Sequence, residues 1–366
     1  MLSFRTVQAN EIEAVKDLWA YSFGNDEPFF SRYFKEMYSP ALTCGLFLHN
    51  QLIVCGQVRT HEIMLRGKPR KCGYLIGITT HVAFRGQGYF KQWMQHIKTW
   101  MQEQGYVCAV LVPFEIGAYK PFGFETCYLK QRLTLPIQAL TGKLHTTMQE
   151  VLNVSELKNI YTQYIKPYHG AIIRDQTAWD YAFLDLAHIQ GHAYRIADDS
   201  GYVLYAIHDN ILKVREMVYL NGQARATLFA FLKGHIGQVT KVVMELPASD
   251  KTIFTINDGI SPTRRNVTEL LPYASGLVLS VEEALDGLEI PKYLKQSVIV
   301  TIGENHYQLS AENGILSVQP SMQADEIMMS IGAFSQYYFG AVTCEKNLFL
   351  QKILPKMDNY MVEDYL

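Results

Sequence analysis

Phe84-Arg85-Gly86-Gln87-Gly88-Tyr89-Phe90 is the stretch that decides the fold of this chain. It follows an apolar run at 74–82, which predicts a buried strand, and precedes 91–104, which predicts a helix. A tight Arg-x-x-Gly turn between strand and helix leaves backbone N–H groups unpaired at the start of the helix, where the helix dipole favours an anion. Because Gly88 has no Cβ, a ligand can approach its backbone closely. The turn therefore predicts a pyrophosphate site.

The segment around this turn alternates strands and helices. An amphipathic helix is expected at 10–23, and Gly105 is expected to end the helix that follows the turn. Further strands are predicted at 2–7, 41–48, 51–65, 107–113 and 126–135. This mixed order predicts a first α+β domain at residues 1–145.

A second domain is expected at residues 146–276. Its predicted elements are helices at 155–164 and 176–187, a hairpin of 202–208 and 211–219 across Asp209-Asn210, a helix at 224–235 and a strand at 239–246. This order repeats the first domain without the Arg-x-x-Gly turn. We interpret it as a duplicated fold that has lost its anion site; an unrelated α+β domain is the alternative.

A third domain is expected at residues 277–366. It combines a short helix at 281–288, a meander of three strands between 297 and 318, and helices at 320–331, 333–338 and 345–354. At 366 residues the chain is too long for one compact core, which agrees with several domains.

Composition narrows the class of protein. A formal net charge of −2 argues against a nucleic-acid partner or a membrane surface. We find no apolar run near the ~20 residues that span a bilayer, and polar residues appear at once after Met1, so a cytoplasmic location is expected. None of the six cysteines forms Cys-x-x-Cys, which favours buried free thiols over a metal site.

A second motif, Tyr119-Lys120-Pro121-Phe122-Gly123-Phe124, makes a resemblance specific. The glycine turn resembles the coenzyme-A pyrophosphate loop of the GCN5-related N-acetyltransferases (GNAT), although Phe90 stands where a small residue is usual. Tyr119 and the Phe-Gly-Phe after it are similar to the motif that marks the general acid of that superfamily. With a C-terminal part that looks like a sterol-carrier protein, the domain order resembles the enhanced-intracellular-survival (Eis) family.

The resemblance implies two GNAT domains in tandem followed by a sterol-carrier-protein-like α/β domain, in an α+β chain that assembles as a hexamer. It implies acetyl-CoA as acetyl donor, no metal, and direct transfer to an amine of a small aminoglycoside- or polyamine-like acceptor. Tyr119 would be the general acid, and the C-terminal carboxylate, here that of Leu366, the general base. The implied coenzyme contacts are Ile78, Thr79, Thr80, Arg85, Gly86, Gln87, Gly88, Tyr89, Phe90, Lys91, Phe114 and Glu115.

The chemistry fits these residue types. An alkyl amine is mostly ammonium at neutral pH, so a base must remove a proton before attack. A terminal carboxylate, with a pKa of about 3.5, becomes a stronger base when buried, and a phenol, with a pKa of about 10, is protonated at pH 7. Asp26, Glu27 and Glu115 can attract a cationic acceptor, with solvated surface charge as the alternative. Two other functions stay open: a non-catalytic acyl-CoA- or lipid-binding protein, and a structural protein.

Overall fold

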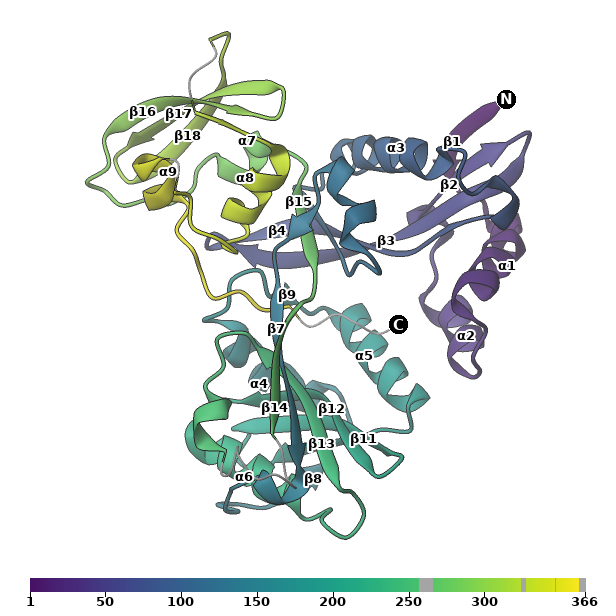
Figure 1. Cartoon of the computed structure of the whole chain (residues 1–366), viewed down its shortest axis with the longest axis vertical. Helices are drawn as coiled ribbons and strands as arrows, with labels where there is room; N and C mark the ends of the chain where they lie inside the picture. The colour runs from purple at the N-terminus through teal and green to yellow at the C-terminus, as the bar shows by residue number, and fades with distance from the viewer. Residues whose placement is uncertain (257–265, 324–326, 346, 362–366) are drawn as a thin grey trace. The chain divides into compact units, whose positions relative to one another are not determined.

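The computed structural model describes residues 1–256, 266–323, 327–345 and 347–361. The chain divides into two compact units (Figure 1). Unit 1 contains Met1–Cys127 and Tyr273–Met357, and unit 2 contains Tyr128–Pro272 and Asp358–Leu366. The chain thus passes from one unit to the other at Cys127–Tyr128, Pro272–Tyr273 and Met357–Asp358. The sequence led us to expect domain boundaries near 145 and 276.

Unit 1 is built on a mixed sheet with the order β1-β2-β3-β4-β5-β15-β6. Its strands are β1 (Leu2–Thr6), β2 (Thr43–Leu48), β3 (Gln51–Leu65), β4 (Lys68–Thr80), β5 (Cys108–Leu111), β15 (Ser275–Val278) and β6 (Glu125–Thr126). The break expected between the second and third strands is a tight turn in which His49 and Asn50 both have positive φ. β4 is parallel to β5, and the other neighbouring pairs are antiparallel.

At the far end of this sheet, the structure differs from the single strand expected at 126–135. Only Glu125–Thr126 belongs to the first sheet, and the place between β5 and β6 is taken by β15, which is distant in sequence. Leu129–Pro136 is instead β7, a strand of the sheet of unit 2. The apolar β15 is fully buried, which explains why it completes this core although no local pattern points to it.

Helices cover both faces of the first sheet (Figure 1). On one face lies α3 (Tyr89–Glu103), whose Trp93, Met94, Ile97 and Met101 are buried in the core. On the other face α1 (Ile12–Phe23) packs Trp19 against β4, where a Cβ on Gly77 would lie 2.5 Å from the Trp19 ring. After α1 comes the short α2 (Phe29–Arg32).

The C-terminal part of unit 1 is a smaller sheet with helices. Its strands have the order β18-β17-β16-β19, and β16 and β19 are parallel. The strands are β16 (Gln296–Ile302), β17 (Asn305–Glu312), β18 (Ile315–Pro320) and β19 (Met328–Met329), and the helices are α7 (Val281–Leu285), α8 (Ile331–Tyr338) and α9 (Leu348–Ile353). The expected helix at 320–331 is wrong, because β18 ends there, β19 follows and Ser330 caps α8.

A half-buried cation links the two parts of unit 1. Arg66, in the turn between β3 and β4, donates hydrogen bonds to the carbonyl oxygens of Tyr338 (2.9 Å) and Pro355 (2.7 Å). Tyr338 is the last residue of α8, where helix carbonyls lack intrahelical partners. Arg66 therefore satisfies the end of this helix and ties the C-terminal part to the first sheet.

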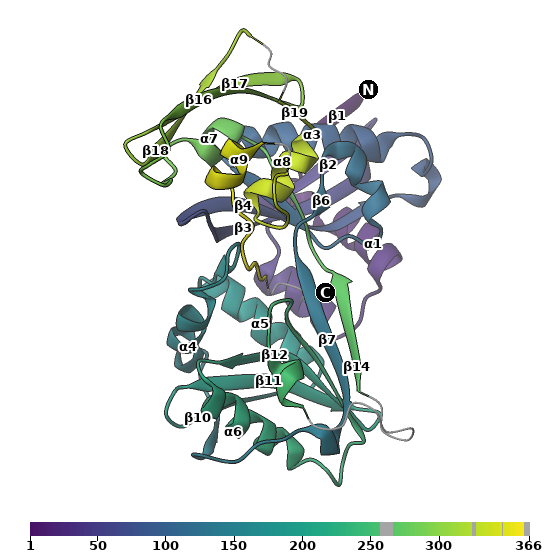
Figure 2. The same cartoon turned by 60° about the vertical axis from the view of Figure 1, so that its left-hand side comes forward.

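Unit 2 is built on a second mixed sheet with the order β14-β7-β13-β12-β11-β10-β8, in which β7 and β14 run side by side (Figure 2). The strands are β7 (Leu129–Pro136), β8 (Met148–Glu150), β10 (His192–Ile196), β11 (Gly201–His208), β12 (Ile211–Tyr219), β13 (Lys241–Pro247) and β14 (Val267–Pro272). The expected hairpin across Asp209-Asn210 joins β11 and β12. β12 and β13 are parallel, as β4 and β5 are in unit 1.

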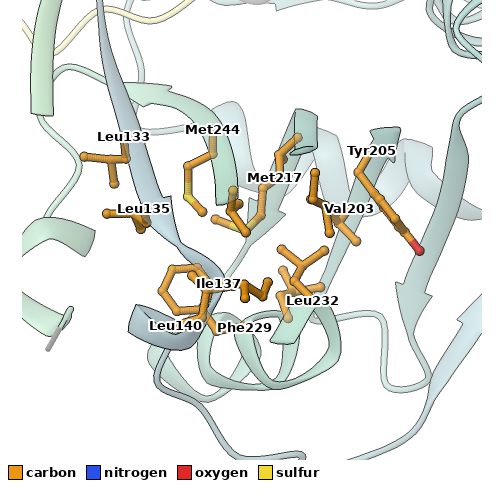
Figure 3. Packing of buried hydrophobic residues seen from close by; sticks show 14 of the residues in the cluster. Leu133, Leu135, Ile137, Leu140, Val203, Tyr205, Met217, Phe229, Leu232 and Met244 are labelled. Atoms are coloured by element: carbon orange, nitrogen blue, oxygen red, sulfur yellow. The ribbon is translucent and has the colours of Figure 1, made fainter. Parts of the chain in front are cut away.

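Helices again lie on both faces of this sheet. They are α4 (Ser155–Ile165), α5 (Gln176–His188) and α6 (Gly222–Lys233), and the short β9 (Ile172–Ile173) lies between α4 and α5. On one face, Leu228, Phe229 and Leu232 of α6 pack against Leu133, Leu135 and Met244 of the strands (Figure 3). On the other face, α4 and α5 pack against Leu204, the neighbour of the α6-facing Val203. No helix in the described parts of the chain is long and apolar enough to cross a membrane.

Candidate active site

The Arg-x-x-Gly turn lies between β4 and α3, as the sequence predicts. Two glycines shape it: Gly86 has a φ of +74°, and Gly88, the residue before the helix, has a φ of +80°. A Cβ at either position would meet no heavy atom within 4 Å, so the turn opens to solvent. No side chain caps α3, and the first amides of a helix have no intrahelical acceptor. The turn can therefore present its N–H groups to an anion.

Two polar side chains of the turn fold back on its backbone. Arg85 donates from Nε to the carbonyl oxygen of Thr80 (3.1 Å), and Gln87 donates from Nε2 to that of Ala83 (3.0 Å). Lys91 is exposed in the first turn of α3. Arg85 and Lys91 place two positive charges beside the helix N-terminus, where they would add to the attraction of a phosphate. Their contacts with a coenzyme stay predictions.

Phe90 departs from the family pattern but does not obstruct the turn. It is the second residue of α3, and its ring packs edge-on against Tyr119 (centroids 5.8 Å apart) and Phe122 (5.7 Å). The large side chain thus points into the core and away from the open turn. Tyr89, at the start of the helix, packs against Phe84 in the same way.

The end of β4 has an edge that β5 does not cover. Pairing of β4 with β5 runs from Cys72↔Cys108 to Tyr74↔Val110, whereas β4 continues to Thr80. On its other edge β4 remains paired with β3 as far as Thr80. Ile78, Thr79 and Thr80 therefore lie on the part of β4 that extends beyond its partner β5, next to the glycine turn. A strand edge of this kind can hydrogen-bond an extended amide-containing chain.

Tyr119 lies between two 3₁₀ turns, Ile116–Ala118 and Lys120–Phe122. It is 5 % exposed, and besides Phe90 its ring contacts Phe124 and the exposed Phe114. Burial raises the pKa of the phenol to about 12, because desolvation disfavours the phenolate. The hydroxyl is thus protonated at neutral pH, as a general acid must be.

The acidic residues expected at the acceptor site lie in separate loops. Asp26 and Glu27 follow α1, whereas Glu115 is exposed after β5, and no hydrogen bond or ion pair joins the two loops among the described residues. The Glu27 carboxylate accepts hydrogen bonds from the hydroxyl (2.6 Å) and the amide (3.3 Å) of Ser31, so it caps α2. The carboxylates of Asp26 and Glu115 make no hydrogen bond or ion pair with another residue that the structure describes.

Leu366, the expected base, lies outside the described residues. The segment before it is anchored in unit 2: His169 donates its amide to the carbonyl of Asp358 (2.8 Å), and Tyr360 donates its amide to the carbonyl of His169 (3.1 Å). The Tyr360 ring is buried against Tyr164 and Tyr168, with centroids 6.1 and 5.3 Å apart. The apolar tail residues at 360 and 361 are thus buried.

Sequence reasoning missed how α1 contacts the end of β4. The hydroxyls of Ser22 and Thr79 hydrogen-bond to each other, and Trp19 packs over Gly77, whose φ is +59°. These contacts fix the strand end beside the glycine turn. A glycine within an apolar strand run was the available signal, since such a residue often marks a close approach. Among the described residues no cluster of three or more His, Cys, Asp or Glu side chains could hold a metal.

Comparison with known families agrees with this geometry. Residues 3–127 match a model of the acetyltransferase (GNAT) domain, and residues 170–268 match a second model with the same description. The chain is an N-acetyltransferase. It carries two GNAT domains in tandem, in an α+β fold with mixed sheets. No curated protein matches it by sequence.

Solved structures share the fold of this N-acetyltransferase over its full length. A GCN5-related N-acetyltransferase from Anabaena variabilis is 15 % identical, with a TM-score of 0.85 over 99 % of both chains. A conserved protein of Enterococcus faecalis, described as a probable N-acyltransferase, is 17 % identical, with a TM-score of 0.86 over 100 % of both chains. Eis1 from Mycobacterium abscessus is 15 % identical, with a TM-score of 0.76 over 98 % of this chain and 97 % of its own. At identities of 15 % and 17 %, these similarities show a shared fold and nothing beyond it.

The second GNAT domain of the N-acetyltransferase differs from the first at its helix N-terminus. In α6 the residue before the helix is Asn221, whose side-chain oxygen accepts a hydrogen bond from the amide of Ala224 (2.8 Å). In α3 the corresponding residue is Gly88, which has no side chain to do so. A side-chain cap occupies the place of an anion, which supports the interpretation that this copy has lost its coenzyme site.

Proposed function

We propose that this N-acetyltransferase takes its acetyl group from acetyl-CoA and transfers it directly to the amine of a small cationic acceptor. The observation that carries the proposal is the open turn at Gly86 and Gly88, which lies at the N-terminus of α3 beside the uncovered end of β4. The pyrophosphate of the coenzyme would accept hydrogen bonds from the turn amides, near Arg85 and Lys91. The pantetheine amides would pair with Ile78–Thr80 of β4.

The chemistry needs no protein nucleophile. The neutral amine attacks the thioester carbonyl carbon, the C–S bond breaks, and the thiolate takes a proton from the Tyr119 hydroxyl. The nitrogen, now bonded to the acetyl carbon, loses its second proton, which restores the Tyr119 hydroxyl through solvent. With a pKa of about 12, Tyr119 is a weak acid in water but remains protonated over the whole neutral range. Backbone N–H groups at the end of β4 would stabilise the oxyanion. The proton lost by the ammonium goes to a base, for which we propose the C-terminal carboxylate of Leu366.

The acceptor we propose is aminoglycoside- or polyamine-like. Asp26 and Glu115 supply negative charge from the two loops at this end of unit 1, and Phe114, which is 83 % exposed beside Tyr119, offers an aromatic face. Cations are attracted both to carboxylates and to aromatic faces. Glu27, already bound to the start of α2, would contribute its charge more than a direct contact.

Titration calorimetry with acetyl-CoA, followed by a thiol-release assay across polyamines, aminoglycosides and lysine peptides, tests the proposal. We expect acetyl-CoA binding, and turnover with a polyamine or an aminoglycoside. Absence of acetyl-CoA binding would refute the donor assignment. Binding without turnover on any amine would favour the acyl-CoA-binding alternative. Turnover on lysine peptides alone would refute the acceptor class.

Three further features are proposed from the family resemblance. The base assignment predicts that removal of Leu366 abolishes turnover but leaves acetyl-CoA binding intact, and unchanged turnover would exclude it. The small sheet of β16–β19 with α7–α9 would be a sterol-carrier-protein-like domain. We also propose a cytoplasmic hexamer, which light scattering on the purified protein would confirm or exclude as an assembly.

A further inference from the structure

Unit 2 contains a cavity of about 530 Å³ between α5 and its sheet. Side chains alternate along a strand, so each strand has a face turned to α6 and a face turned away. On β7, Leu133 and Leu135 lie in the α6 core (Figure 3), whereas Arg132 and Thr134 line the cavity. The cavity thus occupies the sheet face opposite α6.

This position corresponds to one side of the active site in the first GNAT domain. Helix α6 follows β12 as α3 follows β4, and in both domains the preceding strand is parallel to the strand after the helix. The cavity is on the face away from this helix, beside the parallel pair, on the side where the first domain places α1. In the second domain, however, Asn221 caps the helix N-terminus. The second domain thus has a pocket on this side of the sheet, while a side-chain cap occupies the N-terminus of its helix.

Charged side chains of both signs line the cavity in equal number. The cations are Lys130, Arg132, Lys213 and Arg215, and the carboxylates are Asp185, Glu216, Glu245 and Glu269. Three of the carboxylates are held by arginines: Arg215 binds Asp185 (2.8 Å), Arg132 binds Glu245 (2.6 Å), and Arg174, behind the lining, binds Glu216 (2.6 Å). These pairs form a rigid lining that a ligand need not neutralise.

Lys130 also pairs with Glu245 (3.4 Å), so two charges of opposite sign are left, one at each end of the cavity. Lys213 on β12 and Glu269 on β14 are both exposed, and the side chain of neither makes a hydrogen bond or ion pair with a residue that the structure describes. The strand order β14-β7-β13-β12 separates their backbones by three strand spacings of ~4.8 Å, roughly 14 Å. Between the two ends, the paired charges alternate with uncharged side chains, namely Thr134, Val243, Val214, Leu204 and Leu186.

A simple ion gains little in such a cavity, because each end repels the sign that the other attracts. A molecule with both charges satisfies both ends and covers the apolar lining with its chain. A tripeptide spans about 10–11 Å when extended, a length that the reach of the Lys213 and Glu269 side chains would complement. We propose that the cavity binds a linear zwitterion of about tripeptide length, with its carboxylate at Lys213 and its ammonium at Glu269. The site requires neither acetyl-CoA nor the turn at Gly88.

Three peptides that differ only in their end charges test the site on the full-length protein. Triglycine carries both charges, N-acetyl-triglycine only the carboxylate, and triglycine amide only the ammonium. By calorimetry we expect triglycine to bind about tenfold tighter than either blocked peptide, since each charge-assisted contact is worth about a factor of ten. No detectable triglycine binding, or equal affinity for the three peptides, would overturn the proposal.

Two substitutions assign the ends. Lys213→Gln should erase the preference for triglycine over its amide and keep the preference over the N-acetyl peptide, and Glu269→Gln should do the reverse. Both residues are exposed, so both variants should fold, which a melting curve verifies. Lys241→Gln, an exposed change on β13 outside the lining, should leave all three affinities unchanged. If the two cavity variants retain both preferences, the peptide binds elsewhere and the assignment is wrong.

Discussion

The ring of Phe90 meets the ring of Tyr119 edge-on, with centroids 5.8 Å apart and an angle of 85° between the planes. Phe90 belongs to the first turn of α3, the helix whose N-terminus would hold the pyrophosphate. The same helix that presents amides to the donor therefore also supports the proposed acid. The ring of Phe90 thus fills the space beside Tyr119 and leaves the turn open.

Phe90→Ala should therefore reduce kcat more than it reduces acetyl-CoA affinity. Loss of the ring removes a support of Tyr119, and a shift of about 1 Å in a reacting group can cost up to ~10²-fold in rate. The free energy of unfolding should fall by about 1–3 kcal/mol, less than for a fully buried phenylalanine. Phe231→Ala is the control. Phe231 is a half-buried residue of α6 whose ring centroid lies 4.9 Å from that of Tyr194, so the change should lower stability without changing kcat. Equal kcat losses in both variants would argue against a role for Phe90.

Tyr119→Phe should reduce kcat by about 10²–10⁴-fold, the usual contribution of a general acid, while acetyl-CoA affinity changes little. The ring and its contacts with Phe90, Phe114 and Phe124 remain, so only the proton donor is lost. Tyr106→Phe provides the matched control, because it removes a buried hydroxyl that hydrogen-bonds Thr60 (2.6 Å) in the same unit. That variant should lose about 1 kcal/mol of stability and keep its turnover. A kcat for Tyr119→Phe within a few-fold of the wild type would make Tyr119 structural.

The raised pKa of Tyr119 predicts a specific loss of stability at alkaline pH. In the unfolded chain the phenol ionises near pH 10, whereas in the folded protein its pKa is about 12. Between these values the unfolded state binds fewer protons than the folded state, so the free energy of unfolding falls as pH rises. The contribution is complete below pH 10 and is lost toward pH 12. Tyr119→Phe should remove it, so urea unfolding of the variant should depend less steeply on pH above 10 than that of the wild type. Parallel curves would indicate that the phenol is not desolvated.

Gly88→Glu should weaken acetyl-CoA binding at least tenfold, because it adds a like charge and a side chain where the pyrophosphate would approach. The new residue must also adopt a φ of +80°, which costs about 1–2 kcal/mol in stability. Gly105→Glu controls for that cost, since Gly105 has a φ of +73°, open surroundings and a place at the other end of α3. Calorimetry should show normal acetyl-CoA affinity for Gly105→Glu and weakened affinity for Gly88→Glu. Similar affinity in both variants would locate the coenzyme elsewhere.

Local sequence patterns predicted most of the elements but not their assembly. The turn at Gly88, the helix after it and the hairpin across Asp209-Asn210 follow from short-range chemistry, namely glycine at positive φ and alternation along strands. What could not be predicted is that β15 inserts beside β5 and that β7 leaves the first sheet. Both are pairings between segments distant in sequence, decided by burial in a core that no single segment defines.

In the candidate site, too, local features could be predicted from the sequence and contacts between distant segments could not. Placement of the turn and of Tyr119 near one end of the first sheet was predictable from motif spacing. The contacts of Phe90 with Tyr119 and of Ser22 with Thr79 required the packed structure, because they join elements whose relative rotation the sequence does not encode locally. The cap at Asn221 was visible in the sequence, yet its meaning emerges only from comparison of α6 with α3.

The buried ion pair of unit 2 predicts a large loss of stability from a nearly isosteric change. Arg174 donates from both terminal nitrogens to Glu216 (3.0 and 2.6 Å), and their side chains are 0 % and 2 % exposed. The Tyr202 hydroxyl donates to the same carboxylate, and the guanidinium lies 4.3 Å from the centroid of Tyr161. Glu216→Gln keeps the shape but leaves a buried positive charge without its counterion, which should destabilise unit 2 by about 3–5 kcal/mol.

Glu156→Gln is the control for this last prediction. Glu156 pairs with Arg195 at 2.9 Å in the same unit, but the two side chains are 28 % and 19 % exposed, so water compensates the loss and the cost should stay below about 1 kcal/mol. Urea unfolding followed by tryptophan fluorescence, to which the buried Trp179 of unit 2 contributes, measures both changes. If Glu216→Gln costs no more than Glu156→Gln, the guanidinium must be satisfied by its aromatic neighbours, and the ion pair would not be what stabilises this core.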